Sequence, residues 1–342
     1  CLKIGKDFGR HLFRERGKMS EKILTVSIAA YNLSDRIDQC LSSFASAKSI
    51  DDIELIVTND GSKDDTAEKV GKWADRYPDS IRLINKENEG AGSTVNSGIA
   101  HAKGKYFKMV DGDDWVENID EFVSFLKACD SDRVVSDYTF YDNSKKAKDR
   151  TESFSLPEGK FLFDDQWKRI PNERHALCFK TEIRKSVHLD NGFYTDVEYL
   201  LFPLSKVKTV SYFPKPVYIY RVGQRNQSVS PQSRRKHRGD HELVLSHVLG
   251  WLEENKEGRS AQHISFVMKR LVSLIDNQVV IYLLFKPCKE RKGKIRSLIK
   301  RVSSDPRLLA LYKKNKKYRM LKNSHYLLYP LLSYIIRKKS GR

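Results

Sequence analysis

The stretch Lys105-Tyr-Phe-Lys-Met-Val-Asp111-Gly-Asp113-Asp114-Trp115 joins an apolar run, typical of a buried strand, to three carboxylates. Carboxylates this close raise one another's pKa values unless a cation or a hydrogen-bond donor lies among them. An isolated Asp-Gly-Asp sequence is also common in solvated turns. A second acidic turn at Asn59-Asp60-Gly61-Ser62 and a third acidic site at Asp196 favour a ligand-binding site over a plain turn.

Strand and helix patterns alternate in the chain before this stretch. Strands are predicted at 23–30, 53–58, 80–84 and 105–110, with helices between them. Ser62 is the predicted N-cap of the second helix, which would end near Tyr77. This order predicts a mostly parallel sheet whose ligands bind at the carboxyl ends of the strands. Asp60 and Asp111 should therefore lie on the same edge of the sheet.

The pattern changes in the second half of the chain. Strands are predicted at 134–141, 174–180, 209–213 and 216–221, and an exposed loop at 143–150. From residue 233 the apolar spacing is helical. The predicted domains are residues 19–230, divided into halves 19–115 and 116–230, and a basic helical region, 231–342. Residues 1–18, before Met19, are expected to be an extension that is not native or not ordered.

Positive charge is concentrated at the C-terminal end. Residues 286–342 hold 19 Lys and Arg against Glu290 and Asp305, which is +17 of the net charge of +19. Such a tail favours a polyanionic partner, either nucleic acid or an anionic membrane. The apolar run Tyr326–Ile336 is shorter than the roughly 18–20 residues that a spanning helix needs, although it could lie at a membrane surface. Five scattered cysteines favour reduced thiols in the cytosol.

Three features resemble the family 2 glycosyltransferases of the GT-A fold. They are Val26-Ser-Ile-Ala-Ala-Tyr31-Asn32, the turn Asn59-Asp60-Gly61-Ser62-Lys-Asp-Asp-Thr66, and the run from Glu87 to Trp115, which holds Asn88, Gly90, Ser93, Asn96, Gly98, Ala102, Gly104 and Tyr106 before the aspartates. The resemblance covers residues 23–115 strongly and 116–230 more loosely. It implies an α/β fold of the GT-A class: a Rossmann-like, mixed and mostly parallel sheet flanked by helices, here with a C-terminal helical extension.

The resemblance also implies roles for individual residues. The residues that would bind the nucleotide sugar are Ala30, Tyr31, Asn32, Asp60, Asn88, Gly90, Asp111, Gly112, Arg221 and Arg225. Asp60 would accept a hydrogen bond from the base, usually uracil. Asp113 and Asp111 would hold Mn²⁺ or Mg²⁺, which prefer oxygen ligands. Asp114 is expected to cap the next helix.

Inverting transfer needs a base that deprotonates the acceptor hydroxyl as it attacks the anomeric carbon. The run Tyr194-Thr195-Asp196-Val-Glu198 resembles the family's later acidic motif, with Thr195 in place of its first glutamate. Asp196 is the predicted catalytic base, and Glu198 remains the alternative.

The sequence therefore predicts a metal-dependent, inverting glycosyltransferase of the hexosyl or N-acetylhexosaminyl type. Its donor would be a nucleoside diphosphate sugar, usually UDP-linked in this family, and its acceptor a glycan or lipid-linked hydroxyl in cell-surface polysaccharide synthesis. A sugar nucleotidyltransferase and an inactive, transferase-like binding module stay open as alternatives. The basic tail is expected to bind the inner leaflet of the cell membrane, which predicts a cytoplasmic, peripheral protein. No nucleic-acid partner is expected, because no nucleic-acid motif accompanies the charge.

Overall fold

The computed structural model describes residues 21–190, 192, 194–223, 231–255, 257 and 259–340. The predicted extension, residues 1–18, lies outside this part of the chain. The first section contains β1 (Leu24–Ala30), α1 (Ile37–Ala45), β2 (Ile53–Asp60), α2 (Thr66–Arg76), β3 (Ile81–Lys86), α3 (Ala91–His101), β4 (Tyr106–Asp111) and β5 (Trp115–Val116). The next contains α4 (Ile119–Ala128), β6 (Arg133–Asp142), β7 (Ala147–Glu152), β8 (Lys160–Leu162), α5 (Phe163–Gln166), β9 (Leu177–Lys180), α6 (Thr181–Lys185), α7 (Thr195–Leu201) and β10 (Thr209–Val222).

The sheet is built around β1, which pairs in parallel with β2 on one side and with β4 on the other. The strand order is β3-β2-β1-β4-β9-β6-β10-β5. The register sets Ala30 opposite Asn59 and Ala29 opposite Asp111. The predicted parallel order of the first four strands is confirmed, and Asp60 and Asp111 end neighbouring strands on the same edge.

The second part of the sheet mixes strand directions. β9 runs antiparallel to both β4 and β6, whereas β6 and β10 are parallel. The predicted strands 209–213 and 216–221 form the single strand β10, with register shifts on both sides of Pro216. The prediction of two strands was wrong because a strand can pass through prolines, which lack an N–H, by forming a bulge.

Two smaller predictions also need correction. The segment 143–150 is exposed as expected, but its second half begins β7, which pairs with β6 as a hairpin. The helix predicted after Ser62 begins only at Thr66. The Ser62 hydroxyl does not cap it, because that oxygen accepts a hydrogen bond from the backbone N–H of Asn32 at 3.0 Å.

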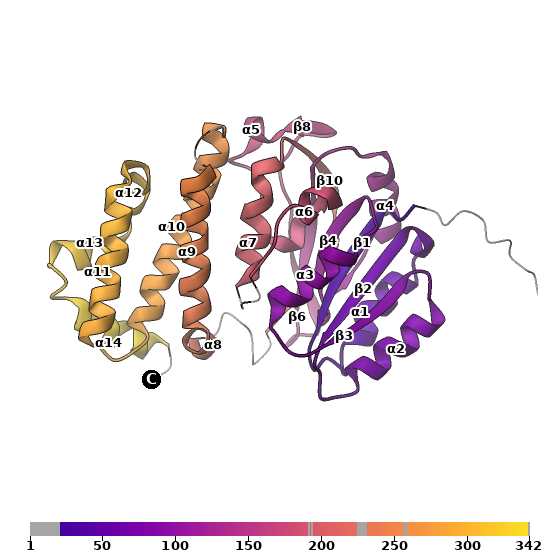
Figure 1. Ribbon diagram of the computed structural model, residues 1–342, viewed down its shortest axis with the longest axis horizontal. Helices are drawn as coiled ribbons and strands as arrows, with labels where there is room; N and C mark the ends of the chain where they lie inside the picture. Colours follow the sequence, from indigo (N-terminus) through magenta and orange to yellow (C-terminus); the bar gives the residue numbers. More distant parts are fainter. Residues whose placement is uncertain are drawn as a thin grey trace, which may run out of the picture.

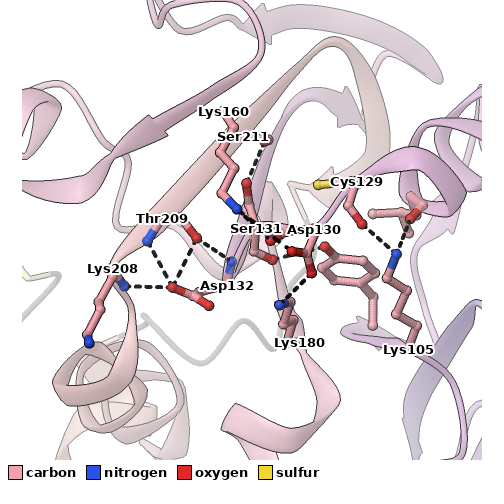
Figure 2. A network of polar contacts seen from close by, with 12 residues as sticks. Lys105, Cys129, Asp130, Ser131, Asp132, Lys160, Lys180, Lys208, Thr209 and Ser211 are labelled. Carbon is pink, nitrogen blue, oxygen red and sulfur yellow. Dashed lines mark hydrogen bonds and ion pairs between the residues drawn. The ribbon is translucent and has the colours of Figure 1, made fainter.

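Polar contacts fasten the edge of the sheet opposite to Asp60 and Asp111 (Figure 2). The Asp132 carboxylate, just before β6, accepts hydrogen bonds from the backbone N–H groups of Lys208 and Thr209 at 2.8 and 2.9 Å. Lys105, just before β4, donates to the carbonyl of Cys129, which follows α4. Lys180 pairs with Asp130 at 2.7 Å. These contacts hold the starts of β4, β6 and β10 together and leave the other edge to the loops.

A helical region follows β10. It contains α8 (Pro231–Lys236), α9 (Arg238–Asn255), α10 (Ala261–Leu283), α11 (Lys289–Ser304), α12 (Pro306–Tyr312), α13 (Lys316–Asn323) and α14 (Tyr329–Lys339). α9 and α10 pack together, and α9 contacts α7, so that α7 lies between the sheet and the helical region (Figure 1). α11 to α14 lie farthest from the sheet (Figure 1). None of the described helices has both the length and the apolar character required to cross a membrane.

α3 packs so closely against β1 that Gly98 has no room for a side chain. A Cβ atom at this position would lie 2.1 Å from Oγ and 2.6 Å from Cβ of Ser27. Ser27 is buried in the middle of β1. The glycine therefore sets the distance between the helix and the central strand.

We predict that Gly98→Ala lowers the free energy of unfolding by about 1–3 kcal/mol, as overpacking of a core does. Alanine is otherwise the better helix former by about 1 kcal/mol. Gly71→Ala in α2 is the matched control, since a Cβ there meets nothing within 4 Å, and it should be neutral or stabilising. Urea unfolding followed by circular dichroism measures both variants. A gain of stability in Gly98→Ala would contradict the close packing.

Candidate active site

The loop that follows β1 is held by the loop that follows β2. Asn32 has a left-handed backbone with φ of +52°, and its side-chain oxygen accepts a hydrogen bond from the backbone N–H of Lys63 at 2.8 Å. Ala30 is buried, whereas the Tyr31 side chain is 48% exposed. Of the three residues predicted to line the base, Tyr31 and Asn32 are thus exposed to a ligand and Ala30 is not.

Asp60 fixes the loop between β3 and α3. One carboxylate oxygen accepts from Lys86 at 2.9 Å and from the backbone N–H of Glu89 at 3.1 Å, and the other accepts from Gly90 N–H at 3.1 Å. Gly90 has φ of +96°, which favours glycine. Asn88 is exposed on this loop. Asp60 therefore shapes the predicted nucleotide loop, and its contact with a base stays a prediction.

The acidic turn after β4 is paired with arginines. Arg174 donates to both oxygens of Asp111, with 2.6 Å between Nη1 and Oδ1. Asp113 lies 3.7 Å from Arg36 of the loop before α1. Gly112, between them, has no room for a side chain, because a Cβ would lie 3.0 Å from the carbonyl oxygen of Ala29. The turn is thus pressed against the end of β1.

Asp114 lies beneath this turn and does not cap α4. It is 2% exposed, and its carboxyl accepts hydrogen bonds from the Tyr218 hydroxyl at 2.6 Å and from the backbone N–H of Arg221 at 2.8 Å. Burial, together with the charges of Asp111 and Asp113, raises its pKa well above the usual range. The predicted cap was wrong because β10, distant in sequence, supplies the partners of Asp114.

The Arg221 guanidinium supports the same turn. It donates to the carbonyl of Asp113 at 2.9 Å and to Gln39 at 2.6 Å, and it lies over the Trp115 ring, 4.8 Å from the centroid. The structure thus shows a positioning role for Arg221, and its predicted contact with a nucleotide sugar stays a prediction. Arg225 lies outside the described residues.

One cavity of about 380 Å³ brings the predicted base to the acidic turn. Asp111 and Arg174 line it on the sheet side, and Asp196, at the start of α7, lines it with them. Arg234 of α8 and Arg270 of α10 complete its lining from the helical region. Residues separated by some 160 positions therefore share a single cavity.

Electrostatics favour Asp196 as a base. Desolvation by the surrounding protein raises the pKa of this carboxyl, while the positive charges of Arg270 and Arg174 act against the rise. The net shift is upward, which makes the carboxylate more basic. The side chain is still 40% exposed, with Arg270 at 3.9 Å, so a substrate hydroxyl can reach it.

Glu198, the alternative base, is turned away from this cavity. Its side chain is 1% exposed and lies 3.0 Å from His247 of α9. Its second oxygen accepts the backbone N–H of Asp190 at 2.8 Å. These contacts connect α7 to the helical region and occupy both carboxylate oxygens.

The sequence predicted no site role for Arg174, Arg234 or Arg270, and His175 was expected to be structural, yet all four line the cavity. His175 packs on the Tyr220 ring with 4.1 Å between ring centroids, and burial together with nearby positive charge lowers its pKa well below the usual value. The ring is therefore neutral. No local pattern marks these residues, since each reaches the cavity only through tertiary packing.

The carboxylate oxygens of the acidic turn are ligands that suit a divalent cation. Asp111, with a side chain 27% exposed, lines the cavity, and the Asp113 side chain is 30% exposed on the same turn. Carboxylate oxygens suit Mg²⁺ or Mn²⁺. Asp111, Asp114 and His175 also place one ligand atom each within 4.8 Å of the others. The assignment of Asp113 and Asp111 as the cation ligands stays a prediction.

Comparison with known proteins gives the family. The model of glycosyl transferase family 2 matches residues 25–189. EpsH of Bacillus subtilis, a glycosyltransferase by name, is 29% identical over 60% of this chain and 62% of its own length. Chondroitin synthase of Pasteurella multocida is 31% identical over 58% of this chain and 20% of its own length. The chain thus spans less than two thirds of these relatives. The domain boundary near residue 230 stays a prediction.

The fold has a solved counterpart. The structure of residues 1–349 of S. aureus TarS with UDP superposes with a TM-score of 0.63 at 17% identity, covering 93% of this chain and 92% of that one. The superposition includes an α/β body and helices after it, which confirms the predicted GT-A class with a C-terminal helical extension. The family match identifies residues 25–189 as a glycosyl transferase family 2 region.

Proposed function

We propose that the chain is an inverting transferase that moves a sugar from a nucleoside diphosphate to a hydroxyl of a glycan or lipid-linked acceptor. The observation that carries this proposal is the single cavity in which Asp196 faces Asp111 and Arg174. The relatives named chondroitin synthase and hyaluronan synthase support a role in polysaccharide synthesis. UDP-linked sugars are the first donors to test, because TarS structures contain UDP or UDP-GlcNAc.

The proposed reaction assigns one proton transfer to the chain. Asp196 takes the proton of the acceptor hydroxyl while its oxygen bonds to the anomeric carbon. The bond from that carbon to the diphosphate oxygen breaks on the opposite face, and the nucleoside diphosphate leaves with the bonding electrons. Asp60 and Arg174 keep the nucleotide loop and the acidic turn in place. A cation held by Asp113 and Asp111 would neutralise charge on the leaving diphosphate.

We predict metal-dependent donor turnover. UDP-glucose, UDP-N-acetylglucosamine and GDP-mannose are each incubated with Mn²⁺, Mg²⁺ or EDTA, and the released nucleoside diphosphate is measured by chromatography. At least one UDP-sugar should turn over with metal, and EDTA should abolish that turnover. Equal rates in EDTA would refute the metal role of Asp113. Failure of all donors to bind or react would support an inactive module.

We predict that Asp196→Asn lowers transfer about 10²–10⁴-fold, because the amide cannot accept the proton. UDP affinity, measured by calorimetry, should not change. Asp165→Asn removes an exposed carboxylate of α5 and serves as the control, with wild-type transfer. Substantial transfer by Asp196→Asn would assign the base to another residue.

The pH profile gives a second readout of the same carboxyl. A base works only when deprotonated, so transfer should be lost as pH falls through its pKa. Because the Asp196 pKa is raised, the acidic limb of kcat/KM should lie above the ordinary aspartate value of about 3.9.

We further propose that α14 binds the inner leaflet, which implies a cytoplasmic, peripheral location. Leu331, Tyr334 and Ile335 are 49%, 56% and 37% exposed, and they share one helical face with Lys338 because they lie three, four and seven positions apart. Leu327, just before the helix, is 76% exposed. Near an anionic surface each Lys or Arg contributes about 1 kcal/mol, and the apolar face adds insertion into the lipid boundary.

We predict that Leu331→Glu combined with Tyr334→Glu weakens binding to vesicles of phosphatidylglycerol, measured by co-sedimentation. Leu162→Glu replaces a 54% exposed leucine of β8, and it should bind like the wild type. Vesicles of phosphatidylcholine should bind all three proteins weakly, since they lack the negative charge. Equal binding of the double variant to anionic vesicles would rule out this face.

A further inference from the structure

The helical region supplies charge to the active-site cavity from outside the part that matches the family. Arg234 comes from α8 and Arg270 from α10, and both line the cavity that holds Asp196. The family match ends at residue 189. α7, which begins next to Asp196, stands between the sheet and the helices that carry these arginines (Figure 1).

The three arginines of the cavity are not equivalent. Arg174 is committed to Asp111 through two hydrogen bonds. Arg270 lies 3.9 Å from Asp196, at the long end of ion pairing, and its buried Nε has no hydrogen-bond partner. Arg234 forms no ion pair with a carboxylate of the described chain. Hydrogen-bond donors of Arg234 and Arg270 thus remain for a ligand on the side of Asp196 that faces the helices.

His241 and Tyr194, which line the cavity together with these arginines, do not supply an anion. His241 lines the cavity, donates from Nδ1 to Oε1 of Gln278 at 2.5 Å, and packs edge-on against Tyr194 with 4.9 Å between the ring centroids. Burial lowers the pKa of His241 and raises that of Tyr194, so both are neutral near pH 7. The positive charge of Arg234 is therefore left for a ligand.

We propose that Arg234 and Arg270 bind an anionic group, a phosphate or a carboxylate, on the acceptor, beside the hydroxyl that Asp196 deprotonates. The proposal rests on the proposed function, because the base identifies the acceptor side of the cavity. The acidic turn and Asp60 lie at the carboxyl ends of β4 and β2, where the donor would bind. Guanidinium groups suit phosphate and carboxylate because they donate two parallel hydrogen bonds. The two arginines would therefore make the protein prefer acceptors that carry an anionic group close to the reacting sugar.

Three sugars that share one ring test the site: glucose, glucose 6-phosphate and glucuronic acid. Each is titrated into protein saturated with UDP and Mg²⁺, and binding is followed by saturation-transfer NMR. The wild type should prefer the two anionic sugars, and Arg234→Gln should weaken their binding about tenfold or more, as expected for loss of a hydrogen bond to a charged group. Arg270→Gln should do the same.

Matched controls lie next to each arginine. Lys236→Gln in α8 and Lys269→Gln in α10 remove the same charge from exposed positions, and they should keep the wild-type preference. UDP affinity, measured by calorimetry, should stay within about twofold of the wild-type value in all four variants. If one of these side chains bound the charged diphosphate, the loss of its hydrogen bond would lower UDP affinity by more than twofold.

Two outcomes would overturn the proposal. The first is equal binding, or equal lack of binding, of the three sugars to the wild type. The second is a tenfold loss of UDP affinity in Arg234→Gln with the sugar preference unchanged, which would give the arginines to the donor diphosphate. If the wild type binds no nucleotide but binds the anionic sugars through Arg234, the anion site is retained and the proposed function is rejected.

Discussion

The parallel pairing of β1 with both β2 and β4 is the constraint on which the site depends. Since the three strands run in one direction, the loops that follow them emerge together at one edge of the sheet. The loops are then tied to one another by side chains, such as Asn32 to Lys63 and Asp60 to Gly90. The opposite edge is fastened by Asp132 and Lys105. Because one edge of the sheet is fastened, the loops at the other edge can carry a polar site while the sheet keeps its packed core.

The helical region contributes to the cavity of the candidate active site. It completes the cavity that the α/β body opens, because Arg234 and Arg270 line it together with Asp196. Glu198 and His247 connect the same helix, α7, to α9. The body thus supplies the residues proposed for donor chemistry, and the helices supply charge on the other side of the base.

The sequence predicts those features of the fold and site that depend on local pattern and on the order of the strands. Asp60 and Asp111 could be placed on one edge because a β-α-β order leaves little freedom in a parallel sheet. Asp114 was assigned wrongly, because its partners Tyr218 and Arg221 come from β10. Arg174 was predicted only as the start of a strand, and the structure brings it to Asp111. Tertiary contacts, which local sequence does not encode, decide these cases.

The choice between Asp196 and Glu198 also depends on tertiary contacts that local sequence does not encode. The sequence left both acids open, yet two residues apart on a helix of 3.6 residues per turn they point about 200° apart. Only one of them can therefore face a cavity on one side of α7. Asp196 lies toward Arg174 and the acidic turn, whereas Glu198 is buried against His247. A helix position that is ambiguous by spacing becomes specific once α7 lies between the sheet and α9, because Asp196 then lines the cavity and Glu198 packs against α9.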